Sequence, residues 1–310
     1  MKGLELSRLY YENICEPKIK EHFPELYSRM AAGLVGQGSE CYGFDDEISR
    51  DHDFGPSCCI WLISDDYKQY GEQLQGFLDL LPKSFMGFAP MEENQWEDKR
   101  RGVFEIESFY YKFTGKNKAP LNPAEWLRIP EEGLSTATNG AIFYDGSGNF
   151  SKIRNEFLEY YPEDVRLDKI AARCMNIAQS GQYNFPRSVK RSEFVAASIA
   201  EGEFIKELIY MAYLLNRKYK PFYKWMHRGL LSLPILGTLI YDRLNTLISI
   251  PVSDYNEKSN IIEEICLYFI LEMKNQRISN SNSDFLLDHG VIVQKNIKDP
   301  ALKNRNPWLG

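Results

Sequence analysis

The stretch GQGSECYGFDDEISRDHDFG, residues 36–55, joins a glycine-rich turn to a crowded group of acidic side chains. Six carboxylates fall within these residues: Glu40, Asp45, Asp46, Glu47, Asp51 and Asp53. Crowded carboxylates raise one another's pKa unless positive charge compensates them. The stretch therefore predicts a bound cation, and a solvated loop with no role is the alternative for Asp45, Asp46 and Glu47.

Asp51 and Asp53 are separated by one residue, and alternate side chains of an extended strand share a face. We therefore expect their carboxylates to lie close together. Mg²⁺ prefers carboxylate oxygens and completes its octahedron with water and substrate phosphate. The pair is predicted to hold Mg²⁺, with Mn²⁺ as an alternative. His52 would point to the opposite face and be packed or hydrogen-bonded there.

Gly38 and Ser39 supply a tight turn upstream of this pair. Its backbone N–H groups and the Ser39 hydroxyl can approach phosphate oxygens without obstruction by a side chain. Together, the turn and the acidic pair predict a site for a nucleoside triphosphate with its metal ion.

The order Gly38-Ser39, eleven residues, then Asp51-His52-Asp53 resembles the motif of the nucleotidyltransferase superfamily with the polymerase-β-type fold. The flanking sequence GSECYGFDDEISRDHDFGP is similar to an uncharacterised bacterial family in which such a domain precedes a helical domain. AQSGQYNFPRSVKR (178–191) and LLNRKYKPFYKWMHRGL (214–230) resemble the same family. The resemblance covers most of the chain to about residue 235.

This resemblance implies an α+β chain: an N-terminal mixed sheet with helices, then a C-terminal α-helical bundle. It also implies an enzyme that transfers NMP from an NTP, most often ATP, to an acceptor hydroxyl and releases pyrophosphate. Superfamily members often carry a third carboxylate on a later strand. Glu105 and Glu107 are the candidates, and Glu105 is favoured to complete the metal site or act as the base.

The second half offers polar and cationic side chains for the triphosphate. Pro186 suits the first turn of a helix, with Gln182 and Asn184 just before it. Arg187 and Arg191 would then share one helical face, and Lys224 lies on another cationic face. A surface salt-bridge face is the alternative for these cations. The predicted nucleotide-binding residues are Gly38, Ser39, Gln182, Asn184, Arg187, Arg191 and Lys224.

Hydrophobic patterning predicts the secondary structure. We expect largely helical structure over residues 5–32 with breaks near Pro17 and Pro24, then a turn over 33–38. A buried strand within 54–64, a helix over 66–81 and a strand over 101–111 are expected to follow. Residues 141–150 suggest two short strands around an Asp145-Gly146 turn. The predicted domains are 1–150, nucleotidyltransferase-like, and 151–280, helical, with a loosely ordered tail over 281–310.

Composition limits the partners. The 310 residues carry a net charge of −6 and a pI of about 5.5, which argues against binding long nucleic acid. A small-molecule or protein acceptor is favoured, and a tRNA end stays open. A non-catalytic nucleotide sensor or antitoxin-type partner is the alternative function. The composition does not indicate an oligomeric state.

The remaining features suggest a cytoplasmic protein. The six cysteines fit neither a zinc site nor a disulfide framework and are expected to be reduced thiols, with Cys58 and Cys59 in the core. The N-terminus lacks a signal-peptide core. The most apolar stretch, residues 230–241, is short and interrupted by Pro234 and Gly237, so no membrane association is expected.

Overall fold

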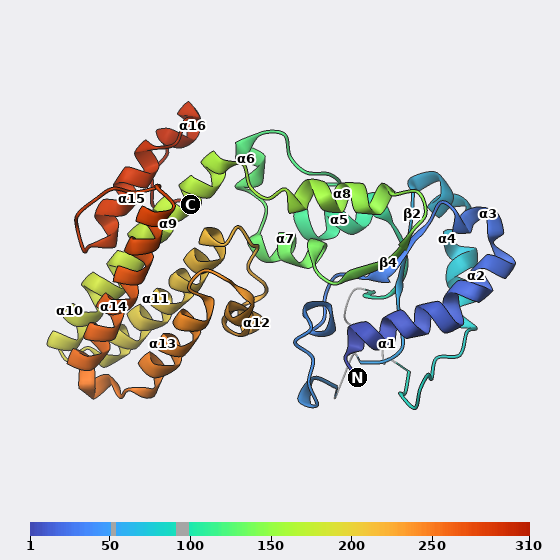
Figure 1. Ribbon diagram of the computed structural model, residues 1–310, viewed down its shortest axis with the longest axis horizontal. Helices are drawn as coiled ribbons and strands as arrows, with labels where there is room; N and C mark the ends of the chain where they lie inside the picture. Colours follow the sequence, from blue (N-terminus) through green and yellow to red (C-terminus); the bar gives the residue numbers. More distant parts are fainter. Residues whose placement is uncertain (51–53, 91–98) are drawn as a thin grey trace. The chain divides into compact units, whose positions relative to one another are not determined.

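The computed structural model describes residues 1–50, 54–90 and 99–310 (Figure 1). The chain forms two compact units. One consists of Met1–Leu121 and Ile129–Glu159 and contains a sheet, whereas the other consists of Asn122–Arg128 and Tyr160–Gly310 and is helical. The predicted α+β class is confirmed.

The N-terminal unit is built on a four-stranded mixed sheet in the order β3-β2-β1-β4. The strands are β1 (Ala31–Leu34), β2 (Cys59–Leu62), β3 (Gly102–Glu105) and β4 (Ala141–Asp145). Strand β1 is antiparallel to both β2 and β4, whereas β2 and β3 are parallel. The predicted strand around CCIWLI is confirmed, and all four residues of β2 are buried.

Both faces of this sheet are covered by helices (Figure 1). On one face, Ala32, Ile60 and Val103 belong to a core cluster with residues from the N-terminal helices and from α4. On the other face, the Trp61 ring stacks on Phe150 with centroids 4.0 Å apart. The helices of this unit are α1 (Gly3–Tyr10), α2 (Glu16–His22), α3 (Pro24–Tyr27), α4 (Ser64–Asp79), α5 (Ile106–Thr114), α7 (Glu131–Thr138) and α8 (Asn149–Leu158), with π-helical residues Tyr11–Cys15 between α1 and α2.

Three predicted elements differ from the structure. Residues 5–32 are helical only as far as Tyr27, and β1 begins within the expected helix and turn. The expected strand over 101–111 ends at Glu105, where α5 begins, because Ile106, Phe109 and Tyr110 also fit the helical spacing and are buried. The expected hairpin at 141–150 is one strand followed by α8.

The turn between β4 and α8 is held by the Asp145 side chain. Its carboxylate accepts hydrogen bonds from the backbone N–H of Gly148 at 2.9 Å and of Ser151 at 2.8 Å. An acidic side chain that receives backbone N–H groups at the start of a helix stabilises that helix. Asp145-Gly146 therefore marks a strand-to-helix turn instead of a hairpin.

Gly140 fixes the entry into β4. Its φ is +62°, and a Cβ atom there would lie 1.9 Å from the carbonyl oxygen of Leu34. Gly115 has a similar φ of +65°, but a Cβ there would meet no atom within 4 Å. The two glycines thus share the backbone strain that alanine would introduce, and only Gly140 adds a collision.

We expect Gly140→Ala to destabilise the protein by about 2–4 kcal/mol, because left-handed strain and overpacking add. Gly115→Ala should cost only about 1–2 kcal/mol, the strain alone. Urea denaturation of both variants measures the difference. Equal losses would show that the backbone relieves the Gly140 collision.

The helical unit is organised around α9 (Glu163–Ile177), most of whose residues are buried. The helices α11 (Phe194–Leu215) and α15 (Leu286–Lys295) pack against it. The other elements are α6 (Pro123–Trp126), a π-helix (Ala178–Asn184), α10 (Phe185–Lys190), α12 (Tyr223–Gly229), α13 (Gly237–Ser249), α14 (Tyr255–Asn275) and α16 (Pro300–Lys303).

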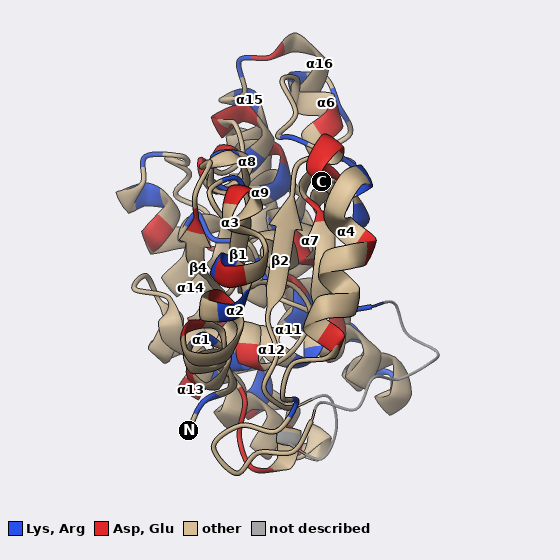
Figure 2. Cartoon of the chain, turned by 90° about the vertical axis from the view of Figure 1, so that its right-hand side faces the viewer, with Lys and Arg blue, Asp and Glu red and all other residues tan. Residues whose placement is uncertain are grey.

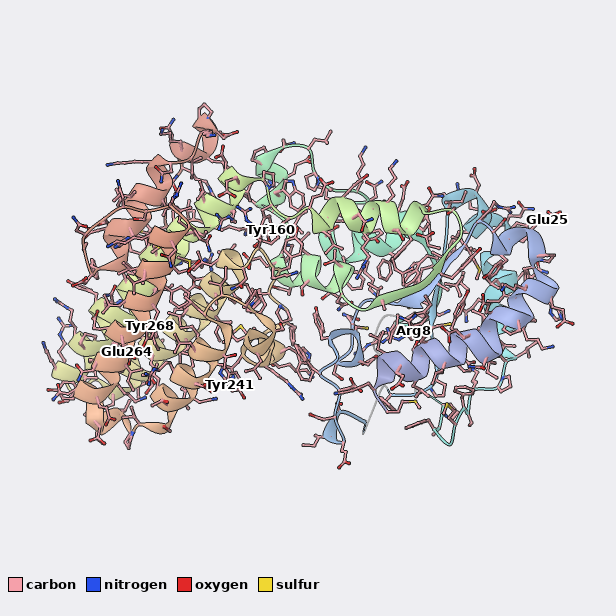
Figure 3. All side chains as sticks on the ribbon, viewed as in Figure 1. Arg8, Glu25, Tyr160, Tyr241, Glu264 and Tyr268 are labelled. Atoms are coloured by element: carbon pink, nitrogen blue, oxygen red, sulfur yellow. The ribbon has the colours of Figure 1, made fainter. Side chains whose placement is uncertain are left out.

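Polar contacts connect α12, α13 and α14. Glu264 and Tyr268 lie one turn apart on α14, and the tyrosine hydroxyl donates to the carboxylate at 2.5 Å (Figure 3). Arg243 of α13 pairs with the same carboxylate at 2.8 Å. The ring of Tyr241, also on α13, stacks on His227 of α12 at 4.3 Å. These contacts hold the three helices in register.

Residues 281–310, expected to be loosely ordered, carry α15 and α16. Leu286, Val293 and Leu302 are buried. The fully buried His289 contacts the Ser279 hydroxyl and the Ser283 carbonyl oxygen, each at 2.8 Å. The prediction of a loosely ordered tail relied on the polar composition of this segment. The polar loop before α15 dominates that composition, so the widely spaced apolar positions were not recognised as core residues. Among the described residues, no helix combines the length and apolar character needed to cross a bilayer.

Candidate functional site

The Gly36–Glu40 loop follows β1 and lies at the end of the sheet where β1 finishes. In the register, Gly33 is opposite Cys59, Leu34 is opposite Ala141, and Cys59 is opposite Gly102. The C-terminal end of β1 therefore lies at the same end of the sheet as the first residues of β2, β3 and β4. The strands are four or five residues long, so the opposite end is about 10 Å away.

Two side chains hold this loop in place. Asn139 forms a pair of hydrogen bonds with Gly36, accepting from its N–H at 2.9 Å and donating to its carbonyl oxygen at 2.8 Å. Arg101, which is 4% exposed, donates to the carbonyl oxygen of Gln37 at 3.0 Å and to the Glu40 carboxylate. The loop is thus held by one residue just before β3 and one just before β4.

The anchored loop leaves several hydrogen-bond donors available. In the described chain, no hydrogen bond is made by the N–H of Gln37, Gly38, Ser39 or Glu40, or by the Ser39 hydroxyl. Gly38 has a φ of +124°, and a Cβ there would lie 2.4 Å from the Glu40 carboxylate, so the close turn requires glycine. Successive free N–H groups form a concavity that suits an anion.

Three of the six crowded carboxylates are paired or hydrogen-bonded by other groups of the protein. Glu40 is paired with Arg101, and Asp45, 1% exposed, accepts the N–H of Gly3 at 2.8 Å at the start of α1. Asp46 closes a turn by accepting the N–H of Ser49 at 3.0 Å. An arginine and a helix N-terminus, which were not predicted from the sequence, therefore compensate part of the negative charge of this stretch.

The central predicted residues, Asp51 and Asp53, lie outside the described residues, as does His52. Their assignment as metal ligands stays a prediction. In the part of the chain that the structure describes, no group of three or more His, Cys, Asp or Glu side chains is arranged to hold a metal ion.

Glu105, the favoured third carboxylate, lies at the opposite end of the strands from the Gly36–Glu40 loop. It ends β3 opposite Leu62 and accepts hydrogen bonds from the hydroxyls of Ser108 and Ser64. Glu107 lies on α5 and accepts from the Asn117 side chain at 3.0 Å. The strand expected over 101–111 would have carried both glutamates, but it ends at Glu105. Neither carboxylate is brought to the Gly36–Glu40 loop.

The hydrogen bonds from Ser108 and Ser64 lower the pKa of Glu105 below its usual value of 4.5. A carboxyl group with a lowered folded-state pKa stabilises the fold above its unfolded pKa, and this contribution disappears as the pH falls through the folded value. We expect Glu105→Gln to be less stable than wild type at pH 7, with the difference shrinking below pH 4.5. Chemical denaturation across this pH range measures it, with Glu107→Gln as the control. A pH-independent difference would contradict this account.

Cys41 adjoins the loop and is buried. Burial raises the pKa of its thiol to about 12. The thiol is therefore protonated at neutral pH and does not supply a nucleophile at this site. The predicted burial of Cys58 and Cys59 is confirmed.

In the helical unit, Gln182 has a structural role. Its side-chain amide donates to Glu263 at 2.6 Å and to the Asp284 carbonyl oxygen at 2.9 Å, and its oxygen accepts the N–H of Leu286 at 2.9 Å. Gln182 therefore ties α15 and the loop before it to the π-helix. Its hydrogen-bonding groups are engaged, so its assignment to a nucleotide is not supported.

Pro186 lies in the first turn of α10, as expected, but no break in the helix precedes α10. The backbone is helical without interruption through α9, the π-helix and α10, and both Asn184 and Phe185 have αR dihedral angles. Asn184 is therefore a residue within this run and faces a cavity described below.

The three predicted cations of this unit are exposed on the surface. Arg187 lies over the Tyr183 ring at 4.6 Å and Lys224 lies over the Trp225 ring at 4.8 Å. Arg191 follows the last residue of α10. Their role toward a triphosphate stays a prediction.

Sequence reasoning missed the residues that hold the loop, Arg101 and Asn139. Asn139 carries a usable signal, because Asn-Gly before an apolar run marks a turn into a strand. Arg101 offers no local signal, since its partners in the loop, Gln37 and Glu40, lie more than 60 residues away in the sequence.

Comparison with protein families gives one match. A model described as "Domain of unknown function (DUF4037)" matches residues 126–226. No curated protein and no solved structure matches the chain. The matched segment contains residues 178–191 and most of the stretch 214–230, and the family description assigns no activity to them.

Proposed function

We propose that the protein is a magnesium-dependent nucleotidyltransferase that transfers NMP, from ATP in the first instance, to a hydroxyl group of an acceptor. The observation that carries this proposal is the anchored Gly36–Glu40 loop. It offers four N–H groups and the Ser39 hydroxyl at the end of the sheet where β2 begins, and Asp51 and Asp53 precede β2 in the sequence.

The chemistry of these groups suits a nucleoside triphosphate. Free N–H groups and a hydroxyl donate to phosphate oxygens. Asp51 and Asp53 provide the carboxylate oxygens that Mg²⁺ prefers, although their geometry lies outside the described residues. When bound, the ion would offset negative charge on the phosphates.

In the proposed reaction, the acceptor oxygen forms a bond to the α-phosphorus. The bond from that phosphorus to the bridging oxygen breaks, and pyrophosphate leaves. The acceptor hydroxyl releases its proton to water in the same process. Glu105 is not kept as the base, because it lies at the opposite end of the strands, where Ser64 and Ser108 bind it.

A small-molecule or protein acceptor fits the charge distribution best. Along α2 acidic and basic side chains are mixed, and α4 carries four acidic side chains and one lysine, so neither helix presents a basic patch (Figure 2). Together with the net charge of −6, this disfavours binding along a polynucleotide. The end of a tRNA needs only a few local cations and stays among the candidates.

The test is to incubate the purified full-length protein with Mg²⁺, labelled NTPs and fractionated cell extract. Pyrophosphate release together with labelling of one extract component is expected. Saturable ATP binding without pyrophosphate release in any fraction would instead identify a nucleotide-binding sensor or antitoxin-type partner.

A further inference from the structure

A cavity of about 440 Å³, open to solvent and lined largely by exposed or half-buried residues, lies on the surface of the helical unit. One wall comes from the continuous helical run of α9, the π-helix Ala178–Asn184 and α10, and the other from α11. Gly181 allows the two walls to approach closely beside the cavity, because a Cβ there would lie 2.2 Å from the Phe204 ring. The whole cavity falls within residues 126–226, the segment that matches the family model.

The first wall is a polar stripe. Asn176, Ser180, Asn184 and Ser188 recur every four residues, and all four line the cavity. In a straight α-helix, a spacing of four drifts by about 40° per step. The seven-residue π-helix has wider turns, which offset this drift and keep the stripe on one side. π-helical turns are rare and occur frequently at functional sites.

Most of the polar groups in this wall are available to a ligand. In the described structure, the side chains of Gln179, Asn184 and Ser188 make no hydrogen bond within the chain. The Ser180 hydroxyl donates to the Asn176 carbonyl oxygen at 2.6 Å but can still accept. The Asn176 amide makes one long contact of 3.4 Å with Glu207. Amides and hydroxyls both donate and accept, so the wall can bind hydroxyl groups in either sense.

The second wall is apolar and the cavity carries little charge. Ala196, Ile199 and Ala200 form this wall, and Ile199 is 68% exposed. Glu203 is the charged lining residue, and its carboxylate is paired with Lys206 at 2.6 Å. The lining contains no lysine or arginine. A phosphate-bearing ligand would therefore find no charge-assisted donor here.

We propose that this cavity is a binding site for a small uncharged polyhydroxylated ring compound, of the size of a mono- or disaccharide. The apolar face of such a ring would pack on Ile199 and its neighbours, while its hydroxyls bond with the amide and hydroxyl stripe. The volume corresponds to roughly fifteen water-sized groups. The proposal goes beyond the nucleotidyltransferase assignment and does not depend on it.

The first test screens a panel of neutral mono- and disaccharides and cyclitols against the full-length protein by saturation-transfer NMR. Binding by at least one member is expected, and Ala196→Phe, which fills the cavity, should abolish it. Val195→Phe is the matched control, because Val195 is 77% exposed and does not line the cavity. The proposal is overturned if no panel member binds, or if Ala196→Phe binds as wild type does.

The second test compares the tightest neutral binder with its monophosphate ester. The ester should bind more weakly. Asn184→Leu should weaken the neutral compound about fivefold, the equivalent of one neutral hydrogen bond. Asn245→Leu, an exposed asparagine on α13, should leave binding unchanged. Equal or tighter binding of the ester, or equal effects of the two leucine variants, would overturn the proposal.

Discussion

Asp51→Asn and Asp53→Asn are each expected to lower the rate of pyrophosphate release by a factor of at least about 10², the effect of losing one electrostatic stabiliser of a transition state. Asparagine keeps the size of the side chain and one oxygen, but it removes the negative charge that a hard divalent cation requires. The loss should therefore fall on Mg²⁺-dependent ATP binding and on turnover, with little change in unfolding free energy.

The matched control for this pair is Glu47→Gln in the same acidic stretch. Glu47 is exposed, so its amide variant changes the local charge by the same amount without touching the proposed site. Pyrophosphate release is measured at saturating Mg²⁺, and ATP binding by calorimetry. If both aspartate variants bind ATP with the Mg²⁺ dependence of wild type, the metal assignment is wrong. If Glu47→Gln loses as much activity as the aspartate variants, the loss comes from the changed net charge of the stretch and not from a lost metal ligand.

The same variants separate the two proposals made for this protein. The described residues that line the cavity all belong to the helical unit, so Asp51→Asn, a change in the N-terminal part of the sequence, is expected to bind the neutral ring compound as wild type does. Conversely, Ala196→Phe tests that cavity without altering the Gly36–Glu40 loop. Failure of one proposal therefore leaves the other to be judged on its own measurements.

Parts of the fold could be predicted where one local signal dominated. CCIWLI is an apolar run of strand length, and the sequence identifies β2 directly. Residues 66–81 show helical periodicity, and α4 covers Ser64–Asp79. By contrast, β1 has the sequence Ala-Ala-Gly-Leu, whose small residues carry little strand preference. Its place in the sheet depends on pairing with β2 and β4, which sequence periodicity does not contain.

In the candidate site too, residues in a local sequence pattern could be predicted and residues that depend on distant contacts could not. Gly38 and Ser39 could be found from sequence, because a glycine-serine turn before an acidic pair is a local pattern. The partner of Glu40 could not, since Arg101 lies 61 residues away. Glu105 was misplaced because VFEIESFYY fits both strand and helix spacing, and the chain turns helical at Ile106. The end of the sheet at which a residue lies depends on where its strand begins and ends.

The buried pair of Arg101 and Glu40 has the largest expected effect on stability. The side chains are 5% and 13% exposed, and Arg101 also donates to the Gln37 carbonyl oxygen. Removing one partner of a buried pair leaves an uncompensated charge in a poorly solvated place. We expect Arg101→Met to lower the unfolding free energy by about 3–5 kcal/mol.

Two further variants show whether charge or packing causes this loss. Arg101→Met combined with Glu40→Gln should recover much of the stability, because no buried charge is left unpaired. Arg217→Met removes a pair with Glu163 whose side chains are 53% and 45% exposed, so it should cost no more than about 1 kcal/mol. Urea denaturation of the four proteins, wild type included, gives the comparison. A double variant no more stable than Arg101→Met would mean that the arginine acts through its contact with Gln37. In that case the loop would depend on a hydrogen bond to its backbone and not on the neutralisation of Glu40.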